Sequence, residues 1–335
     1  MRSNSQSGFT LGTEAARSID TLIVTCLFAV AGLGILALSP SAAPAEPSQI
    51  LPARYAAAAP AITAPRPDPD FYPWQSPQPF QAHEPERRAP AVPLNSAEAF
   101  LTRLADPQSD AHFYASTHNN HGNHYGGHWR EENATPTSSG TLLSVRTANG
   151  QAQPFTAAEM QTAGQYSYGR YEVIMRPARG SGLVSSFFTY TGSWFGDPHD
   201  EVDIEFLGKD TTKVFFNYFR QGRRGAHATI DLPFDAADAD RLYAFEWTPE
   251  GITWFIEGVP VYASPEGAAG LPVAPGKIYM NVWPGAPSIH GWTGRPALRQ
   301  SAGAHYSCVS FVPLGGAGAS CADVYTPPGT TTLSR

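Results

Sequence analysis

The chain has 335 residues and a formal net charge of −7, and only 15% of its residues are charged. This balance provides no basic stripe that could neutralise phosphates, so it argues against binding to nucleic acid or to an anionic membrane surface and favours a neutral ligand. The 31 Gly, 31 Pro, 14 Tyr and 18 Phe residues favour strands and turns over surface helices. The composition therefore predicts an all-β protein.

Residues 1–45 have the features of an export signal or a membrane anchor. Residues 22–38 form a nearly uncharged apolar run that follows Arg2 and Arg17 and precedes a small-residue stretch at 41–45. The run is close to the roughly 18 residues that can span a bilayer. We favour cleavage after the small residues and expect a secreted or periplasmic protein, which would contact a membrane only if the segment is retained.

The next segments differ sharply in composition. Residues 46–95 are dominated by Ala and Pro without a periodic apolar pattern, which predicts an extended linker. A short helix is expected over residues 96–104, where Asn95 or Ser96 could act as the N-cap. We place the folded domain at residues 96–318 and a C-terminal tail at residues 319–335.

Two cysteines, Cys308 and Cys321, lie in the part of the chain that would remain after cleavage. An oxidising compartment would allow a disulfide between them. Two unpaired thiols are equally compatible with the sequence, because the sequence does not give the distance between the two Cα atoms.

Strand-like runs separated by Gly, Pro and Asp turns recur through the folded domain. No stretch of helical periodicity is long enough to build βαβ units, and no repeat of fixed period is present. A sandwich of two antiparallel sheets is therefore expected. The expected strands cover residues 142–146, 166–176, 183–190, 202–207, 213–219, 241–248, 253–256 and 277–283.

Three acidic residues alternate with apolar ones in one of these runs. A strand would place Glu201, Asp203 and Glu205 on one side and the apolar residues between them on the other. Such a pattern often marks only a solvated face. Like charges at i and i+2 nevertheless repel at roughly 7 Å. Their crowding could keep one carboxyl protonated while another stays ionised, as hydrolysis of a glycosidic bond requires.

The spacing of the outer acids is compatible with a retaining mechanism. Retaining glycosidases hold two carboxyls about 5 to 5.5 Å apart, whereas the Cα atoms of strand residues i and i+4 are about 13 Å apart. The long side chains of Glu201 and Glu205 could lean together over a twisted sheet and close this gap.

The segment from Asp200 to Val214 closely resembles the active-site strand of bacterial lichenases in glycoside hydrolase family 16. Residues 168–173, 182–190, 216–218, 243–247 and 280–283 also resemble that family, so the likeness covers roughly Phe113 to Phe311. It implies an all-β jelly-roll sandwich of two antiparallel sheets with a concave substrate cleft, and double displacement with retention of configuration.

The resemblance also implies a role for each acid. Glu201 would be the nucleophile, Glu205 the general acid and then the general base, and Asp203 would hold and tune the pair. Substrate-binding roles would fall to Glu159, Asn217, Asn281 and Trp283, with Tyr125 as an aromatic subsite residue and Trp292 as a weaker candidate. Core packing is the alternative for both tryptophans.

Several positions depart from the lichenase pattern. His199 stands where lichenases usually carry a Trp, Gln161 where an Arg is common, and Phe219 where a Tyr is found. Ser307 falls where some members supply an Asp to a structural calcium, so we expect neither this ion nor another cofactor. Five histidines, at positions 112, 118, 121, 124 and 128, are close in sequence, but no carboxylate or thiolate completes a regular ligand spacing, and we expect no metal site there.

The residues together predict a monomeric endo-β-glucanase that acts on mixed-linkage β-1,3-1,4-glucan. Hydrolysis of a bacterial exopolysaccharide or of β-1,3-glucan is the alternative within the enzyme class. A non-catalytic jelly roll that only binds polysaccharide is the alternative outside it. Glu201 and Glu205 in register with each other argue for the enzyme.

Overall fold

The computed structural model describes residues 98–105, 112–120, 124–148, 153–265, 270–297 and 301–329. The expected export segment and linker, residues 1–95, lie outside this part of the chain, as does His121. None of the helices within the described ranges is long and apolar enough to cross a membrane.

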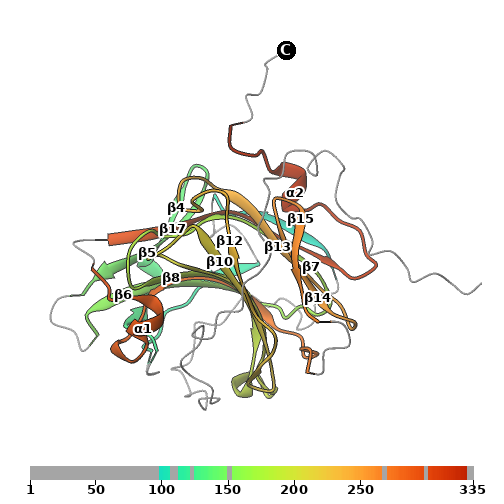
Figure 1. The fold of residues 1–335 in the computed structure, drawn as a ribbon, viewed down its shortest axis with the longest axis horizontal. Coiled ribbons are helices and arrows are strands. Elements are labelled where there is room, and N and C mark those ends of the chain that lie inside the picture. Colours follow the sequence, from blue (N-terminus) through green and yellow to red (C-terminus); the bar gives the residue numbers. More distant parts are fainter. Residues whose placement is uncertain are drawn as a thin grey trace, which may run out of the picture. The chain divides into compact units, whose positions relative to one another are not determined.

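Most of the described residues belong to β-strands (Figure 1). Short helices are present at α1 (His290–Thr293) and α2 (Cys321–Val324), with 3₁₀ turns at Glu131–Asn133, Ser193–Phe195 and Pro287–Ile289. The strands are β1 (Phe100–Arg103), β2 (Phe113–Ala115), β3 (Gly127–Trp129), β4 (Ala134–Thr137), β5 (Gly140–Thr147), β6 (Phe155–Thr162), β7 (Gly169–Arg176), β8 (Leu183–Thr191), β9 (Asp200–Leu207), β10 (Lys213–Arg220), β11 (Arg223–Arg224), β12 (Ala228–Asp231), β13 (Arg241–Trp247), β14 (Ile252–Ile256), β15 (Val259–Ala263), β16 (Lys277–Pro284) and β17 (Ser301–Pro313).

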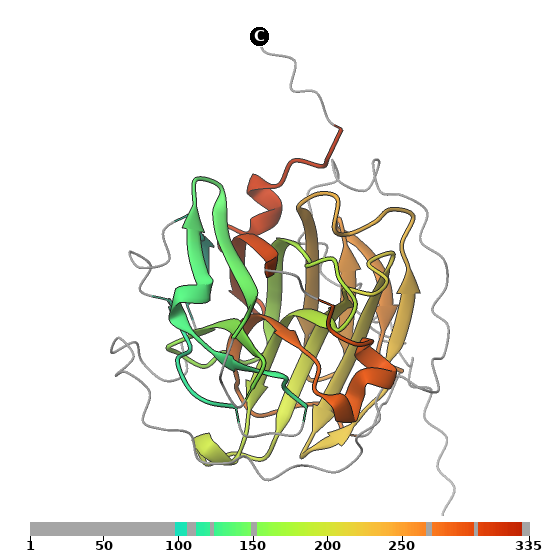
Figure 2. The same cartoon turned by 90° about the vertical axis from the view of Figure 1, so that its left-hand side faces the viewer.

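The described strands form two layers that share β6. In the first layer, sheet A, the order is β2–β6–β16–β8–β9–β10–β12. In the second layer, sheet B, the order is β15–β14–β13–β7–β17–β5–β4, with β1 beside β17. Pairing is antiparallel among these strands apart from β3 on β6. Figure 2 shows the strands running side by side. The predicted all-β antiparallel architecture is confirmed.

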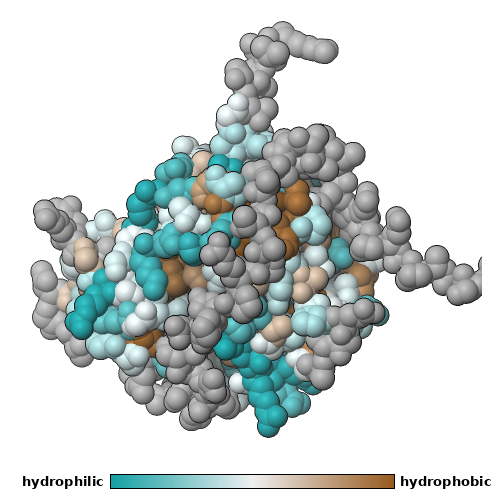
Figure 3. All heavy atoms as spheres, viewed as in Figure 1, coloured by the Kyte–Doolittle hydropathy of each residue, from teal (hydrophilic) through white to brown (hydrophobic). Residues whose placement is uncertain are grey.

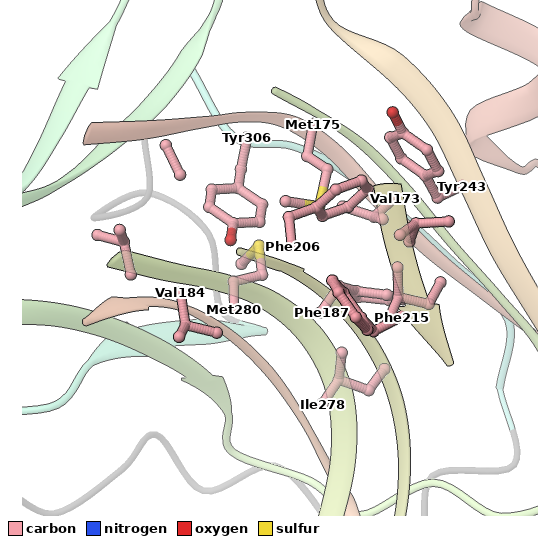
Figure 4. Packing of buried hydrophobic residues seen from close by; sticks show 14 of the residues in the cluster. Val173, Met175, Val184, Phe187, Phe206, Phe215, Tyr243, Ile278, Met280 and Tyr306 are labelled. Carbon is pink, nitrogen blue, oxygen red and sulfur yellow. The ribbon is translucent and has the colours of Figure 1, made fainter. Parts of the chain in front are cut away.

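Alternation along the strands of sheet A separates a core side from a polar side. Val202, Ile204 and Phe206 of β9 are fully buried, as are Ile278 and Met280 of β16. Burial of each such side chain contributes about 1.5–3 kcal/mol to stability. Apolar residues of sheet B, among them Met175 and Val173, pack in the same cluster (Figure 4). On the face drawn in Figure 3, hydrophilic residues surround the scattered apolar ones.

Two aromatic side chains of sheet B donate hydrogen bonds to the backbone of sheet A. The Tyr306 hydroxyl of β17 donates to the carbonyl oxygens of Ser186 (2.9 Å) and Asn281 (2.8 Å). The Trp254 indole of β14 donates to the carbonyl oxygen of Asp203 at 3.0 Å. These bonds satisfy polar groups that would otherwise be buried without a partner, and they fix sheet B against three neighbouring strands of sheet A.

The prediction of a helix at residues 96–104 was wrong, because the described part of this segment contains strand β1. It pairs with β17 from Phe100 opposite Phe311 to Arg103 opposite Cys308. Phe100 is buried and its ring lies 5.3 Å from that of Tyr166, whereas Arg103 is exposed. Pairing with an available strand edge and burial of one aromatic ring outweigh the weak helical preference of so short a segment.

Cys308 and Cys321 form a disulfide with their Cα atoms 5.9 Å apart, which settles the two alternatives left by the sequence. The bond joins β17 to α2, and the Ala322 amide donates to the Glu172 carboxylate at 2.8 Å. Tyr325 is 6% exposed and packs in the same small apolar cluster. The segment through Tyr325 therefore packs on sheet B, although it lies within residues 319–335, which we assigned to a C-terminal tail.

Replacing both cysteines by serine should lower the free energy of unfolding by about 2–4 kcal/mol, because the bond closes a loop with a sequence separation of 13 residues. Urea unfolding of the double variant and of the wild type, each with and without reductant, measures this difference. Activity of the folded double variant should be preserved, since the cysteines pack in a cluster separate from the main core. An unchanged unfolding midpoint would contradict the prediction.

Candidate active site

The three acids of β9 lie on the side of sheet A that faces away from the core. Residues directly opposite each other in a β-ladder have their side chains on the same side, so the pairing register shows what surrounds the acids. Glu205 is opposite Ser186 of β8, which is opposite Asn281 of β16, which is opposite Glu159 of β6. One row thus joins residues from four strands, and we call this side of sheet A the acidic face.

A second row of the acidic face passes through Asp203. Asp203 is opposite Asn217 of β10 and Phe188 of β8, and Phe188 is opposite Tyr279 of β16. The Phe188 and Tyr279 rings are stacked with centroids 5.0 Å apart. Gln161 of β6 continues the row.

A third row passes through Glu201. This residue is opposite Tyr190 of β8 and Phe219 of β10, and Tyr190 is opposite Lys277 of β16. The pKa of the Tyr190 hydroxyl is raised, first by burial and then by the charge of Glu201. Tyr190 therefore stays protonated beside the acids and can donate a hydrogen bond.

Asp203 is the carboxyl on which the crowding of the three acids acts most strongly. Its side chain is buried, and the Asn217 amide donates to Oδ2 at 2.6 Å. Burial raises the pKa of Asp203 well above its ordinary value, and the charges of Glu201 and Glu205 and a side-chain hydrogen bond with Glu201 raise it further. The bond from Asn217 acts in the opposite direction but does not cancel these effects. The crowding that the sequence predicted within the triplet therefore acts on Asp203, whose pKa it raises.

Glu201 is held by a second neighbour on the other side. Nε2 of His199 lies 2.5 Å from Glu201 Oε2. Glu201 is partly exposed, whereas Asp203 and Glu205 are buried. Of the three acids, Glu201 is therefore the one that a reacting atom can reach. Its hydrogen-bonding partners are His199, which precedes it on the chain, and Asp203, which follows it.

A chain of hydrogen bonds connects β16 to Glu159 across the acidic face. Lys277 Nζ donates to Gln161 Oε1 (2.8 Å), the Gln161 amide donates to Ser116 Oγ (2.8 Å), and Ser116 Oγ donates to Glu159 Oε1 (2.8 Å). Sequence reasoning missed Lys277 and Ser116 as members of the site. Alternation along β16 could have indicated Lys277, because it lies on the same side as Asn281; Ser116 lies outside any strand and gave no such signal.

The aromatic candidates lie together at one end of the acidic face. The Trp283 ring is 4.8 Å from that of Tyr125 and 6.2 Å from that of Trp292. Both tryptophans are 5% exposed, so packing against each other is established for them, while stacking on a sugar stays a prediction. Burial raises the pKa of Tyr125, and the charges of Glu159 and Glu201 raise it further, which places its hydroxyl in the field of the acids.

Asn281 supplies a binding group that protein atoms leave open. It is 2% exposed, and within the described ranges its Oδ1 atom has no hydrogen-bond donor. A buried carbonyl oxygen without a donor costs free energy that a ligand hydroxyl could recover.

The rows and ring contacts of the acidic face bring together all nine residues that the sequence singled out, namely Tyr125, Glu159, Glu201, Asp203, Glu205, Asn217, Asn281, Trp283 and Trp292.

The two oxygen atoms of Ser307 both take part in hydrogen bonds within the protein. Its hydroxyl donates to the carbonyl oxygen of Ile174 at 3.4 Å, and its own carbonyl accepts from the Leu104 amide. Calcium takes about 6–8 oxygen ligands that include carboxylates. The described part of the chain contains no group of three or more His, Cys, Asp or Glu residues suited to a metal ion.

Two of the histidines that are close in sequence have contacts within the protein. The His112 ring stacks on that of Phe100, and Nδ1 of His128 accepts a hydrogen bond from the backbone amide of Asn120.

Comparison with known proteins agrees with the geometry. Residues 121–301 match the family model described as glycosyl hydrolases family 16. A beta-glucanase of Bacillus amyloliquefaciens is 42% identical over 193 residues, which cover 58% of this chain and 74% of that protein. A solved β-1,3-1,4-glucanase (lichenase) from a mouse hindgut metagenome is 36% identical with a TM-score of 0.61, covering 64% of this chain and 99% of that one. The solved Bacillus licheniformis beta-glucanase is 38% identical with a TM-score of 0.59, covering 64% and 97%. The predicted jelly-roll fold class is confirmed.

Replacing Asp203 by Asn should change how stability depends on pH. Because the folded-state pKa is raised, the proton on Asp203 stabilises the native state below the unfolded pKa of about 3.9, and this stabilisation is lost as the pH rises toward the folded pKa. Asn stays neutral at every pH. Asp203→Asn should therefore exceed the wild type in free energy of unfolding at pH 7, and the difference should shrink steadily toward zero as the pH falls to about 4.

Urea unfolding at several pH values between 4 and 8 measures this difference. Asp238→Asn is the matched control, since that side chain is 70% exposed and its variant should follow the wild-type pH dependence. If the free energy of unfolding of Asp203→Asn and of the wild type changed with pH in the same way, the pKa of Asp203 would not be raised in the folded protein.

Proposed function

Because the chain belongs to glycosyl hydrolases family 16, we propose that it is an endo-β-glucanase that hydrolyses mixed-linkage β-1,3-1,4-glucan with retention of configuration. The observation that carries this proposal is the placement of Glu201, Asp203 and Glu205 on one face of β9, with the buried middle acid hydrogen-bonded by Asn217. Each acid then has a distinct task.

In the first step, Glu201 attacks the anomeric carbon while Glu205 donates its proton to the glycosidic oxygen. The bond between the anomeric carbon and that oxygen breaks, and an ester between the sugar and Glu201 forms. Asp203 donates a hydrogen bond to the Glu201 carboxylate and so orients it before the attack. Asn217, bonded to Asp203 Oδ2, holds Asp203 in place.

In the second step, Glu205 acts as a base. It removes a proton from water as the water oxygen attacks the anomeric carbon, and the ester oxygen of Glu201 leaves as a carboxylate. Two displacements at the same carbon restore the original configuration. The enzyme returns to its starting protonation state, since Glu205 has regained the proton that it gave to the leaving group.

Polar and aromatic groups on the acidic face suit a neutral polysaccharide. The Oδ1 atom of Asn281 can accept from a sugar hydroxyl, Glu159 lies in the same row, and Asn217 lies in the neighbouring row of Asp203. Trp283 and Tyr125 would provide an apolar surface for a pyranose ring. The net charge of −7 agrees with a neutral rather than an anionic polymer.

Two further predictions from the sequence belong to this proposal. The disulfide between Cys308 and Cys321 supports export to an oxidising compartment, whether the protein is secreted, periplasmic or held at a membrane by its N-terminal segment. We also propose that the enzyme acts as a monomer without a cofactor, because two carboxylic acids supply all the proton transfers that the reaction needs.

Replacing Glu201 or Glu205 by Gln should reduce kcat on the polysaccharide by more than about 10³-fold, since the first change removes the nucleophile and the second removes the acid and base. Glu246→Gln is the matched control, because Glu246 lies on β13 of the opposite sheet, and its kcat should match the wild type. Thermal unfolding confirms that each variant is folded. Full activity of Glu201→Gln would remove the proposed mechanism.

Azide distinguishes the two roles. In Glu201→Ala, azide would occupy the space of the lost carboxylate and give the α-glycosyl azide in one displacement. In Glu205→Ala, with an aryl β-glycoside as substrate, azide would attack the ester on Glu201 and give the β-glycosyl azide. The reverse assignment of products would exchange the roles of the two residues.

The substrate is tested by release of reducing ends from lichenan, laminarin and a succinoglycan-type polymer. Lichenan should be cut at least about tenfold faster than the other two, and NMR should detect the β-anomer of the new reducing end first. Faster cleavage of either other polymer would select that alternative substrate. Release of the α-anomer first would contradict retention, and binding without cleavage of any polymer would favour the non-catalytic jelly roll.

A further inference from the structure

His199 has an unusual position for a residue that replaces the Trp of lichenases. It immediately precedes β9, and its ring stacks on that of Phe219 of β10 with centroids 5.0 Å apart and an interplanar angle of 22°. The Tyr190 ring of β8 lies 5.2 Å away. Its Nε2 atom is 2.5 Å from Glu201 Oε2. The imidazole therefore contacts two aromatic rings, and its Nε2 atom is directed at the proposed nucleophile.

The backbone that carries His199 is fixed by several bonds. Its carbonyl oxygen accepts from the Gly222 amide at 2.8 Å. The next residue, Asp200, is buried and accepts from Arg220 Nη1 (2.7 Å) and from the Gln221 amide (2.9 Å). Asp200 also accepts from two backbone amides at residues 273 and 274. With its backbone anchored and its ring held by stacking, His199 has little freedom to leave Glu201.

We propose that His199 is a positioning residue that holds Oε2 of Glu201 through Nε2–H and leaves the other carboxylate oxygen directed toward the anomeric carbon. This inference rests on the proposed function, in which Glu201 is the nucleophile. A benzene ring at position 199 would preserve the stack on Phe219 but offer no donor. An amide side chain would preserve the donor but not the stack.

Hydrogen bonding at Glu201 has a consequence for the pH dependence of the reaction. A donor to a carboxylate favours its ionised form, so removal of the donor makes protonation of the nucleophile easier and moves the acid limb of the activity profile to higher pH. In the described part of the chain, the titratable and charged groups around His199 and Glu201 include Tyr190 from β8, Asp203 and Glu205 from β9, Lys277 from β16 opposite Tyr190, Arg224 from β11 opposite Phe219, and Tyr125.

The test compares His199→Phe with His199→Gln, neither of which has a titrating side chain at position 199. We expect His199→Phe to shift the acid limb of kcat upward by about one pH unit and to lower kcat about tenfold with KM within twofold of the wild type. His199→Gln should keep the acid limb within about 0.3 unit of the wild type, because its amide can still donate. An aryl β-glycoside serves as substrate, and thermal unfolding checks that both variants are folded.

A wild-type acid limb in His199→Phe would overturn the proposal. An equal shift in both variants would also overturn it, since the stacked ring rather than the donor would then be responsible. A loss of kcat in His199→Phe without any movement of the acid limb would indicate a purely structural role for His199, and it would likewise overturn the proposal. Failure of the proposed function is a separate outcome, seen as full activity in Glu201→Gln.

Discussion

The burial of Asp203 between two glutamates is the constraint on which the rest of the site depends. The two-residue period of β9 places three carboxyls on one face, while Val202, Ile204 and Phe206 lock the opposite face into the core, so the strand cannot rotate to separate the charges. Burial and the charges of both glutamates raise the pKa of Asp203, and a proton on this middle acid would relieve the repulsion. In the proposed mechanism that proton gives Glu201, the nucleophile, a hydrogen-bond donor in place of a second negative charge.

Sheet B contributes to this arrangement without reaching the acidic face. The Trp254 indole bonds to the carbonyl oxygen of Asp203, and the Tyr306 hydroxyl bonds to those of Ser186 and Asn281, which belong to the row of Glu205. Each contact therefore lies directly behind a residue of the proposed site. Because these donors are themselves fully buried, a shift of sheet A against sheet B would leave polar groups unpaired.

Features of local origin could be predicted from the sequence, and features created by distant pairing could not. Alternation alone placed Glu201, Asp203 and Glu205 on one side of a strand. In contrast, β1 was expected as a helix, because its pairing with β17 joins segments about 200 residues apart and leaves no local signal. The bonds from Lys277 through Gln161 and Ser116 to Glu159 likewise require three separate segments to meet. The geometry of the Cys308–Cys321 pair also depends on how α2 packs.

The departures from lichenases are not scattered at random over the acidic face. His199 and Phe219 stack on each other at the Glu201 row, and Gln161 lies in the row of Asp203. The Glu205 row, which includes Asn281 and Glu159, matches the pattern expected from the family. On the acidic face these departures lie in the rows of Glu201 and Asp203 rather than in that of Glu205. Under the proposed mechanism, in which Glu201 is the nucleophile, we therefore propose that differences in substrate choice originate beside Glu201 rather than beside Glu205.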